Sequence, residues 1–370
     1  MSLGFPKSKR IWVYGEWFGE RFGDNSSYAF LQESIERKDI RKIWISKDWQ
    51  IVEYVKKIGY ESYHAYSVKG LFVQARAGVY FCSVNSRDFC FSSLTPRAII
   101  FQLWHGIPLK KIGLDIEKAS FKSRLFSFIR RMTTDKYSYL LSPSKSYDDF
   151  FCSAFGVKQN KLLRCGYPRC DGLVYNSKIK DCLSQNLGGR KYKYVIFYLP
   201  THRHEGKKPD KINYLVQQIL GLQVLLEKFD CLLVVKPHYY EKNNVSEITH
   251  GNIVVTHSLP YDLYVSLSGA DALISDYSSV ILDVASVEKP VFSYIPDVRS
   301  YEQEERGGYY RYEDILPNAC YNTHQLERSL LRFFSGEPVL QEIKVDIKML
   351  SEGTSFSKDL QKIAEELVLG

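Results

Sequence analysis

Short apolar runs alternate with amphipathic stretches along the whole chain, a pattern typical of parallel strands joined by crossover helices. In the first half we expect strands at Arg10–Tyr14, Lys42–Ile45, Ala77–Cys82 and Ala98–Gln102, and helices at Ser26–Glu36, Trp49–Ile58 and Val68–Ala75. In the second half we expect strands at Tyr194–Leu199, Cys231–Lys236, Ile253–Thr256, Ala272–Ser275 and Val291–Ser293. The pattern therefore predicts an α/β protein.

The chain length and one polar stretch indicate how these elements divide. A chain of 370 residues exceeds one compact core of ordinary size, which favours two domains that meet at a cleft. Residues Asn176–Lys191 are polar, contain two adjacent glycines and precede a new series of strands. We therefore expect an interdomain linker there, with a similar α/β half on either side.

Composition and charge narrow the class of protein. Hydrophobic residues make up 45% of the chain and charged residues 25%, which excludes wholesale disorder, a collagen-like repeat and a coiled coil. The 50 Lys and Arg against 42 Asp and Glu give a formal net charge of +8. This excess suits a phosphate-rich partner without choosing among nucleotide, nucleic acid and membrane surface. No signal peptide or membrane-spanning run is visible, so we expect a cytoplasmic protein.

The eight cysteines form neither a C-x-x-C pair nor a dense framework, and we interpret them as reduced thiols. Cys165 and Cys170 flank the sequence Gly-Tyr-Pro-Arg, and their spacing leaves zinc binding or redox activity open. No second Cys/His pair lies nearby, which favours the interpretation that these two cysteines are small buried hydrophobic residues.

The first segment with chemical potential is Phe101–Gly113, FQLWHGIPLKKIG, at the end of a predicted strand. Ligands of open parallel sheets bind beyond the carboxyl ends of the strands, so we expect His105 to face the cleft. His105 can exchange a proton near neutral pH, and Gly106 beside it permits close approach of backbone or substrate. A structural histidine with satisfied hydrogen bonds is the alternative interpretation.

Three polar segments follow strands of the second half. Ala272–Ser286, ALISDYSSVILDVAS, predicts a strand, a tight turn and a helix that begins near Ser278 and Ser279 and suits a phosphate. An ordinary helix cap is the alternative. Leu199–Arg203 and Lys236–His238 add cation-capable side chains at the same sheet edge, namely His202, Arg203, Lys236 and His238. Together these four side chains can neutralise a diphosphate without a metal ion.

A further segment, Tyr301–Tyr312, reads YEQEERGGYYRY and mixes carboxylates with cations. Glu304 or Glu305 suits sugar hydroxyls, and Arg306 suits a phosphate. A solvated acidic and basic loop is the alternative.

Taken in order, six motifs resemble those of the CDP-glycerol glycerophosphotransferase family, which builds teichoic acids and related capsule polymers. The motifs are QLWHGIPLK (102–110), GYPRCD (166–171), LPTHR (199–203), KPH (236–238), SDYSSVILDVA (275–285) and EERGGYY (304–310). The resemblance implies a GT-B fold in which two Rossmann-like domains face a central cleft. It also implies an acceptor domain at 1–180, a CDP-alcohol donor domain at 190–345 and a C-terminal helix at 346–370.

The resemblance implies roles for individual residues as well. The family's proposed general base matches His105, and its donor pyrophosphate contacts match His238, Ser278 and Ser279. We assign catalysis to His105 and His238. The same matched segments place on the donor side Arg203, Lys236, Asp276, Ser278, Ser279, Asp283, Glu305 and Arg306, and on the acceptor side Trp104, Gly106, Lys110 and Arg169. This interpretation requires no metal or cofactor, since the CDP-alcohol is a substrate.

The implied reaction transfers an alcohol phosphate from a CDP-alcohol to a hydroxyl of a lipid-linked or growing glycan or polyol-phosphate acceptor, and CMP leaves. Glycerol phosphate is the first choice and ribitol phosphate the alternative. Two other functions stay open: a GT-B glycosyltransferase that uses a nucleotide sugar, and a non-enzymatic polyanion-binding protein. No aromatic-interleaved RNA motif is visible, so we expect no nucleic-acid partner.

The segment at 120–132, SFKSRLFSFIRRM, predicts a basic amphipathic helix. Its apolar side chains recur at three- and four-residue spacing, and its cations occupy the remaining positions. Such a helix can lie in the headgroup region of an anionic membrane. We therefore expect a peripheral protein at the inner face of the cell membrane. Packing of this helix on its own domain is the alternative.

Overall fold

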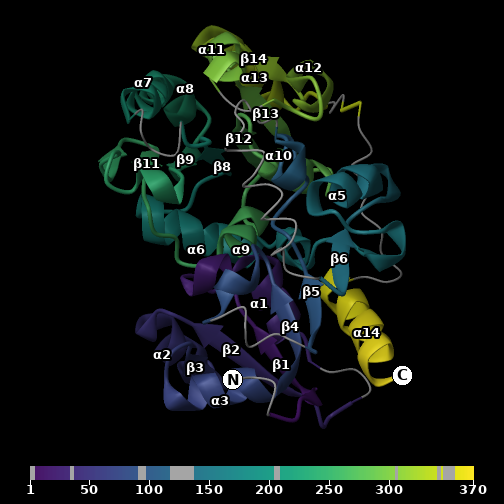
Figure 1. Cartoon of the computed structure of the whole chain (residues 1–370). Coiled ribbons are helices and arrows are strands. Elements are labelled where there is room, and N and C mark those ends of the chain that lie inside the picture. Colours follow the sequence, from purple (N-terminus) through teal and green to yellow (C-terminus); the bar gives the residue numbers. More distant parts are fainter. Residues whose placement is uncertain are drawn as a thin grey trace. The chain divides into compact units, whose positions relative to one another are not determined.

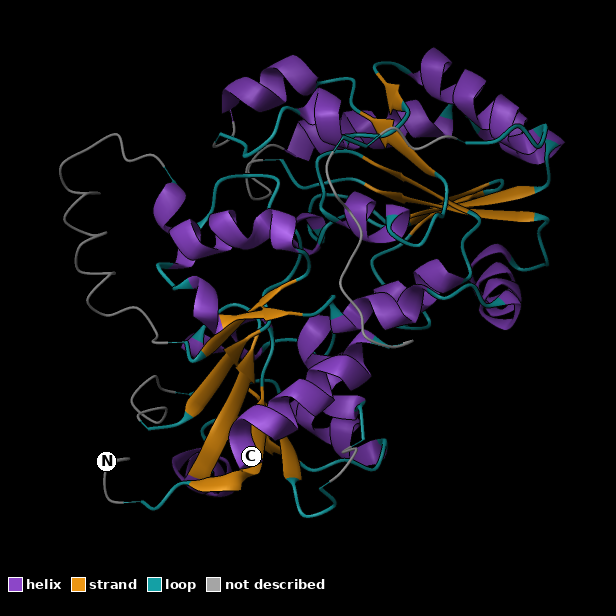
Figure 2. Ribbon diagram, turned by 90° about the vertical axis from the view of Figure 1, so that its right-hand side faces the viewer, coloured by secondary structure: helices purple, strands orange, loops and turns teal. Residues whose placement is uncertain are grey.

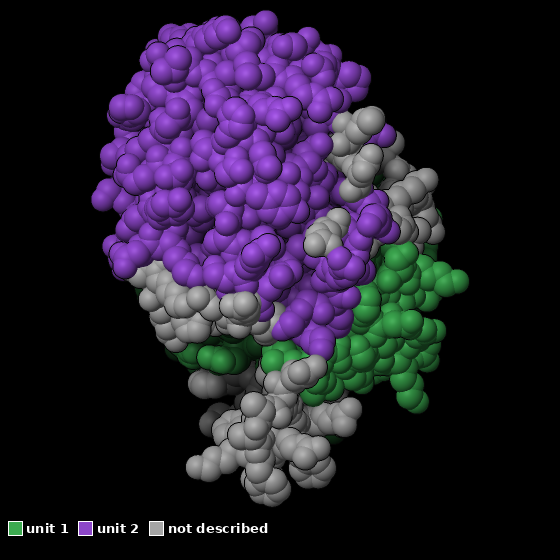
Figure 3. Space-filling model, turned by 90° about the horizontal axis from the view of Figure 1, so that it is seen from above, with its two compact units in different colours: residues 1–106, 112–171, 348–370 green, residues 107–111, 172–347 purple. Residues whose placement is uncertain are grey.

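The computed structural model describes residues 5–33, 37–90, 97–116, 137–203, 209–304, 307–339, 343–344 and 355–370 (Figure 1). The chain divides into two compact units. Unit 1 comprises residues 1–106, 112–171 and 348–370, and unit 2 comprises residues 107–111 and 172–347 (Figure 3). Each unit combines a largely parallel sheet with flanking helices, which confirms the predicted α/β class (Figure 2).

Unit 1 is built on a seven-stranded parallel sheet in the order β3-β2-β1-β4-β5-β6-β7. Its strands are β1 (Ser8–Tyr14), β2 (Arg41–Ser46), β3 (Ser62–His64), β4 (Ala77–Cys82), β5 (Ile99–Gln102), β6 (Tyr139–Ser142) and β7 (Leu162–Arg164). Its helices are α1 (Asp24–Leu31), α2 (Trp49–Lys57), α3 (Val68–Arg76), α5 (Asp148–Phe155) and α14 (Phe356–Leu369). The strand order reverses direction between β1 and β4, where doubly wound sheets bind ligands.

Unit 2 repeats this topology in the order β10-β11-β9-β8-β12-β13-β14, with only β10 antiparallel to its neighbour. Its strands are β8 (Tyr194–Leu199), β9 (Cys231–Val235), β10 (Ile248–His250), β11 (Ile253–Val255), β12 (Ala272–Ser275), β13 (Val291–Tyr294) and β14 (Ala319–Cys320). Its helices are α6 (Ser177–Gly188), α7 (Pro209–Leu220), α8 (Gln223–Lys228), α9 (Leu263–Ser268), α10 (Val280–Ala285), α11 (Val298–Glu304), α12 (Tyr312–Ile315) and α13 (Thr323–Phe334). The direction reverses between β8 and β12.

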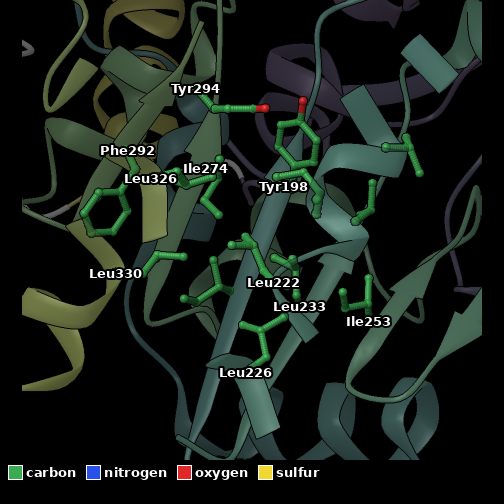
Figure 4. Packing of buried hydrophobic residues seen from close by; sticks show 14 of the residues in the cluster. Tyr198, Leu222, Leu226, Leu233, Ile253, Ile274, Phe292, Tyr294, Leu326 and Leu330 are labelled. Carbon is green, nitrogen blue, oxygen red and sulfur yellow. The ribbon is translucent and has the colours of Figure 1, made fainter. Parts of the chain in front are cut away.

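The core of unit 2 forms where amphipathic helices cover the sheet. Leu222 precedes α8 and Leu226 lies within it, and both pack with Leu233 of β9 (Figure 4). Leu326 and Leu330 lie four residues apart on α13 and belong to the same cluster. Side chains at that spacing share one helix face, so each helix buries one apolar stripe against strands that are buried on both sides.

The predicted linker at Asn176–Lys191 is wrong, because most of it forms helix α6. The Asn176 side chain accepts hydrogen bonds from Lys178 N and Ile179 N, and Gly189 ends the helix with a left-handed φ of 74°. The polar residues and paired glycines that suggested a linker are thus the caps of a surface helix. The chain instead leaves unit 1 near residue 171.

The C-terminal helix α14 belongs to unit 1, although the whole of unit 2 precedes it in the sequence. The Asp171 carboxylate accepts hydrogen bonds from Phe356 N (2.8 Å) and Ser357 N (2.9 Å) at the start of α14. Farther along the helix, Lys42 Nζ donates to Gln361 Oε1 (2.5 Å). These contacts fix the return of the chain to the first sheet.

None of the described helices is both long enough and apolar enough to cross a lipid bilayer. The basic amphipathic segment predicted at 120–132 lies outside the described residues.

Candidate functional site

In unit 1, the loop that carries His105 follows β5 at the carboxyl edge of the sheet. Trp104 adopts a left-handed backbone conformation with φ of 56°, and Gly106 has φ of 134°. A left-handed tryptophan costs free energy, so surrounding contacts have to hold it in place. The motif therefore presents His105 on a strained turn rather than within a regular element.

The His105 loop is held by a buried clamp, which we define as Asp24, Asn25 and Arg169. Asn25 Nδ2 donates to Trp104 O (3.0 Å), and the Arg169 guanidinium donates to His105 O (2.9 Å). The same guanidinium nitrogen lies 3.0 Å from both oxygens of Asp24, and Arg169 N donates to Asn25 Oδ1 (3.2 Å). Asn25 Nδ2 also lies 3.4 Å from Leu103 O, so the clamp holds the carbonyl groups before, at and after the strained residue.

We expected Arg169 on the acceptor side, but the structure buries it. Its side chain is 4% exposed, and its charge is paired with Asp24. A guanidinium engaged in this way positions the His105 loop and is poorly placed to contact a substrate.

Aromatic rings surround the His105 imidazole. The Trp104 ring stacks on it at 3.9 Å between centroids, and the Trp17 ring meets it edge-on at 5.6 Å. Trp17 lies in none of the six motifs identified in the sequence. Its position next to His105 depends on the pairing of β1, β4 and β5 in the sheet.

A buried carboxyl group lies beneath the same edge of the sheet. Glu16 lies two residues after the end of β1, is 2% exposed and accepts a hydrogen bond from Ser83 Oγ (2.5 Å). Burial, together with the nearby carboxylates of Asp24 and Asp88, raises the pKa of the Glu16 carboxyl well above its ordinary range. Sequence reasoning missed this residue, because a single Glu after a strand carries no pattern.

In unit 2, the polar segments after β8, β9 and β12 meet at one edge of the sheet, as predicted, because these three strands are direct neighbours. The His202 and His238 rings lie 4.7 Å apart between centroids. Glu241 joins their loops, since its backbone N donates to His238 O (2.8 Å) and its Oε1 accepts from Arg203 N (3.3 Å). Two histidines that are 36 positions apart in sequence therefore form one cluster.

Arg203 and Asp276, both assigned to donor binding from the sequence, are instead buried together at this edge. Their side chains are 3% and 0% exposed, and Arg203 also pairs with Asp297. Burial alone would lower the pKa of the Arg203 guanidinium, but Asp276 and Asp297 raise it above its ordinary value. The ion-pair cluster holds the backbone after β8, since Asp276 Oδ1 also accepts from Thr201 N (2.9 Å).

The remaining residues that we assigned to the donor side differ in their exposure to solvent. Asp283 is fully buried and accepts a hydrogen bond from the Tyr264 hydroxyl (2.6 Å), which places it in the interior rather than on a donor surface. Ser278, Ser279 and Lys236 are half-buried at the sheet edge. Glu305 and Arg306 lie outside the described residues.

We placed Lys110 on the acceptor side in the first domain, whereas the structure assigns it to unit 2. Its ammonium lies 4.6 Å from the centre of the Tyr301 ring. The segment pairs with the glycine-rich motif, since Lys111 N donates to Gly307 O (2.8 Å) and Tyr309 N donates to Leu109 O (3.0 Å). The Trp-His-Gly motif therefore ends in unit 1, and its Pro-Leu-Lys continuation packs on unit 2.

Neither a metal cluster nor a cysteine site emerges in the part of the chain that the structure describes. Within it, no three His, Cys, Asp or Glu side chains gather to hold a metal ion. Cys165 and Cys170 are buried, and Cys165 Sγ lies 3.5 Å from Phe356 O at the start of α14.

Comparison with known proteins identifies the family to which the chain is similar. The family model for CDP-glycerol:poly(glycerophosphate) glycerophosphotransferase matches residues 1–334. A teichoic acid poly(glycerol phosphate) polymerase of Bacillus spizizenii is 27% identical over 327 residues, which cover 86% of this chain and 82% of that protein. A teichoic acid glycerol-phosphate transferase of Staphylococcus aureus is 29% identical over 326 residues, which cover 84% and 80%.

The fold agrees with these sequence matches. A solved structure of the wall teichoic acid polymerase TagF superimposes with a TM-score of 0.75 at 20% identity, over 98% of this chain and 90% of that one. The predicted GT-B fold is thereby confirmed. With two Rossmann-like units, six matching motifs and a family model that covers most of its length, the chain belongs to the CDP-glycerol:poly(glycerophosphate) glycerophosphotransferase family of transferases.

Proposed function

We propose that this protein transfers glycerol phosphate from CDP-glycerol to a hydroxyl group of a growing teichoic acid polymer, with CMP as the leaving group. The observation that carries the proposal is the His105 loop, where a buried three-residue clamp maintains a strained backbone around one histidine. A fold that needed only a turn there would not require a left-handed tryptophan. Glycerol phosphate is preferred over ribitol phosphate because both relatives described above are named for glycerol phosphate.

In the proposed reaction, the oxygen of the acceptor hydroxyl attacks the glycerol-bearing phosphorus, and His105 accepts the proton of that hydroxyl. The bond between that phosphorus and the bridging oxygen breaks, and the bridging oxygen leaves on CMP. Positioning and electrostatic stabilisation supply most of the rate in such transfers. We assign stabilisation of the leaving phosphate to His238, with His202 beside it at 4.7 Å between ring centroids.

The half-buried donor-side groups complete the proposed phosphate site. The hydroxyls of Ser278 and Ser279 are suited to hydrogen bonds with the diphosphate, and Lys236 is suited to its charge. Arg203 and Asp276 contribute indirectly, because their ion pair holds the loop on which His202 lies.

We also propose that the protein meets its acceptor as a peripheral protein on an anionic membrane. Support comes from the basic amphipathic sequence at 120–132. Sedimentation with anionic vesicles at low salt tests this part separately from catalysis, because it needs no turnover. Absence of the protein from the pellet would contradict it.

The catalytic proposal is tested with the variant His105→Ala. Turnover should fall by roughly two to four orders of magnitude, the usual worth of a positioned acid or base, while calorimetric affinity for CDP-glycerol stays close to that of the wild type. His324→Ala is the matched control, because His324 is exposed on α13, away from the motifs. Wild-type turnover in His105→Ala would remove this residue from the mechanism. Turnover with a UDP-sugar in place of a CDP-alcohol would favour glycosyl transfer.

A further inference from the structure

We propose that the carboxyl edge of the unit 1 sheet carries an acceptor track that binds the polyol-phosphate chain of the acceptor and leads it to His105. We define the acceptor track as Trp17, Phe18, Lys47, Trp49, His64 and Arg87. The proposal rests on the proposed function and specifies its substrate: the acceptor is recognised as an extended polyanion over several repeats, in addition to its terminal hydroxyl.

The half of the track near His105 consists of two aromatic rings and a cation in contact. The Trp17 ring lies 5.6 Å from the His105 ring and 6.1 Å from the Phe18 ring. The Arg87 guanidinium lies over the Phe18 ring at 5.2 Å from its centre. These contacts connect the loops that follow β5, β1 and β4.

The far half continues through Lys47. Lys47 Nζ donates to Arg87 O (2.6 Å), and Lys47 O lies 2.9 Å from His64 Nε2. The His64 ring in turn stacks on Trp49 at 4.4 Å between centroids. The track therefore continues without a break to the ends of β2 and β3.

The track is long enough for more than one repeat of the polymer. Together with His105 after β5, it crosses the ends of five neighbouring strands, from β5 to β3 in the sheet order. Four strand spacings amount to about 19 Å. A glycerol phosphate repeat has twice as many backbone bonds as an amino-acid residue, so its extended length is roughly 7 Å. Two to three repeats would fit along the edge.

The two aromatic residues at the His105 end of the track are held out of the core at a conformational cost. Trp17 and Phe18 have left-handed φ values of 42° and 60°, yet both side chains are only half-buried. Two hydrogen bonds maintain this backbone: Phe18 N donates to Asp88 Oδ1 (2.7 Å), and Trp17 N donates to Ser83 Oγ (3.3 Å). Strain that leaves the rings partly exposed indicates a surface with a binding role.

The chemistry of the track matches a polyol phosphate. Trp49 is 57% exposed at the far end, and Arg87 is exposed midway along the track. Ring faces suit the carbon-bound hydrogens of a polyol, whereas Arg87 and Lys47 suit its phosphates. Aromatic platforms alternating with cations bind other flexible phosphate polymers in the same way.

The experiment compares an oligo(glycerol phosphate) acceptor with a mono(glycerol phosphate) acceptor. The test variant is Trp49→Ala with Arg87→Ala, and the matched control is Tyr54→Ala with Lys57→Ala, which removes an exposed aromatic ring and a cation from the other end of α2. We expect the wild type to bind the oligomer about tenfold more tightly than the monomer, at low salt. The test variant should lose this preference and the control should keep it.

Calorimetry with each acceptor gives the binding preference without turnover, and CMP release gives the same preference as a ratio of KM values. A wild type with no preference, a test variant that retains it, or a control that loses it equally would overturn the acceptor track. Failure of every CDP-alcohol to yield CMP would overturn the proposed function instead. In that case, the calorimetric preference would still decide whether the track binds the polymer.

Discussion

Replacing Asn25 by alanine tests whether the buried clamp sets the activity of His105. The Asn25 side chain is fully buried. Its Nδ2 donates to Trp104 O (3.0 Å), and its Oδ1 accepts from Arg169 N (3.2 Å). Asn25→Ala removes these two bonds, together with a longer one from Nδ2 to Leu103 O (3.4 Å), and leaves the Trp104 carbonyl and the Arg169 amide without these partners.

The expected losses of stability and of kcat follow from these two groups and from the strained turn. Each orphaned buried group costs about 1–3 kcal/mol, so the free energy of unfolding should fall by roughly 2–6 kcal/mol. The left-handed conformation of Trp104 stores about 1–3 kcal/mol, which the loop regains if it relaxes. Recovering the active geometry would then cost that amount in every turnover, which corresponds to a decrease in kcat of roughly 5- to 150-fold.

The assay measures CMP release and thermal unfolding on the same samples, at a temperature where the variant is fully folded. Ser27→Ala is the control, because Ser27 is buried on α1 and its hydroxyl donates to the Asp24 backbone carbonyl (3.1 Å), whereas the clamp uses the Asp24 carboxylate. It should lower stability by about 1 kcal/mol without the same loss of kcat. If folded Asn25→Ala turns over within twofold of the wild type, or if Ser27→Ala loses as much, the clamp does not position His105.

Three further predictions concern stability, pH and donor affinity. Arg203→Ala should lower the free energy of unfolding by about 3–5 kcal/mol in denaturant titrations, because it leaves the buried Asp276 carboxylate without its partner; an unchanged midpoint would contradict the structural role. Burial lowers the pKa of Lys42 to about 7 in the folded protein, so above that pH unfolding takes up a proton. The free energy of unfolding should therefore rise with pH, by up to about 1.4 kcal/mol per unit between about pH 7 and pH 10. Lys42→Met should remove this slope, and a wild type whose stability falls across the window would refute the sign. Ser278→Ala with Ser279→Ala should weaken calorimetric CDP-glycerol binding by about tenfold through loss of two hydroxyl partners, and unchanged affinity would move the diphosphate elsewhere.

The sequence by itself was sufficient for the strands that form the centre of each sheet. β4, β8 and β12 begin and end where the apolar runs predicted, because strands buried on both faces have to be apolar at nearly every position. The edge strands β3, β7, β10 and β14 were not predicted, and neither was β6 beside β7. The edge strands are two or three residues long, and β10 is exposed throughout, so no long apolar run marks them.

The motifs likewise identified segments that lie at the carboxyl edges of the two sheets, because His105 follows a strand of unit 1, and His238 and the two serines follow strands of unit 2. The sequence did not distinguish an exposed cation from one that is buried in an ion pair. Arg169 and Arg203 lie in motifs that suggested contact with substrate, yet both are buried, Arg169 paired with Asp24 and Arg203 with Asp276.

Only the tertiary structure decided the burial and pairing of these side chains, because both depend on residues that are far apart in the chain. Arg169 meets Asp24 across 145 positions, and Arg203 meets Asp276 across 73. Trp17 comes next to His105 only because β1 and β5 lie on either side of β4 in the sheet. A local pattern fixes which face of a strand or helix is apolar, whereas the energy of a charge depends on which partners the fold brings within hydrogen-bond distance.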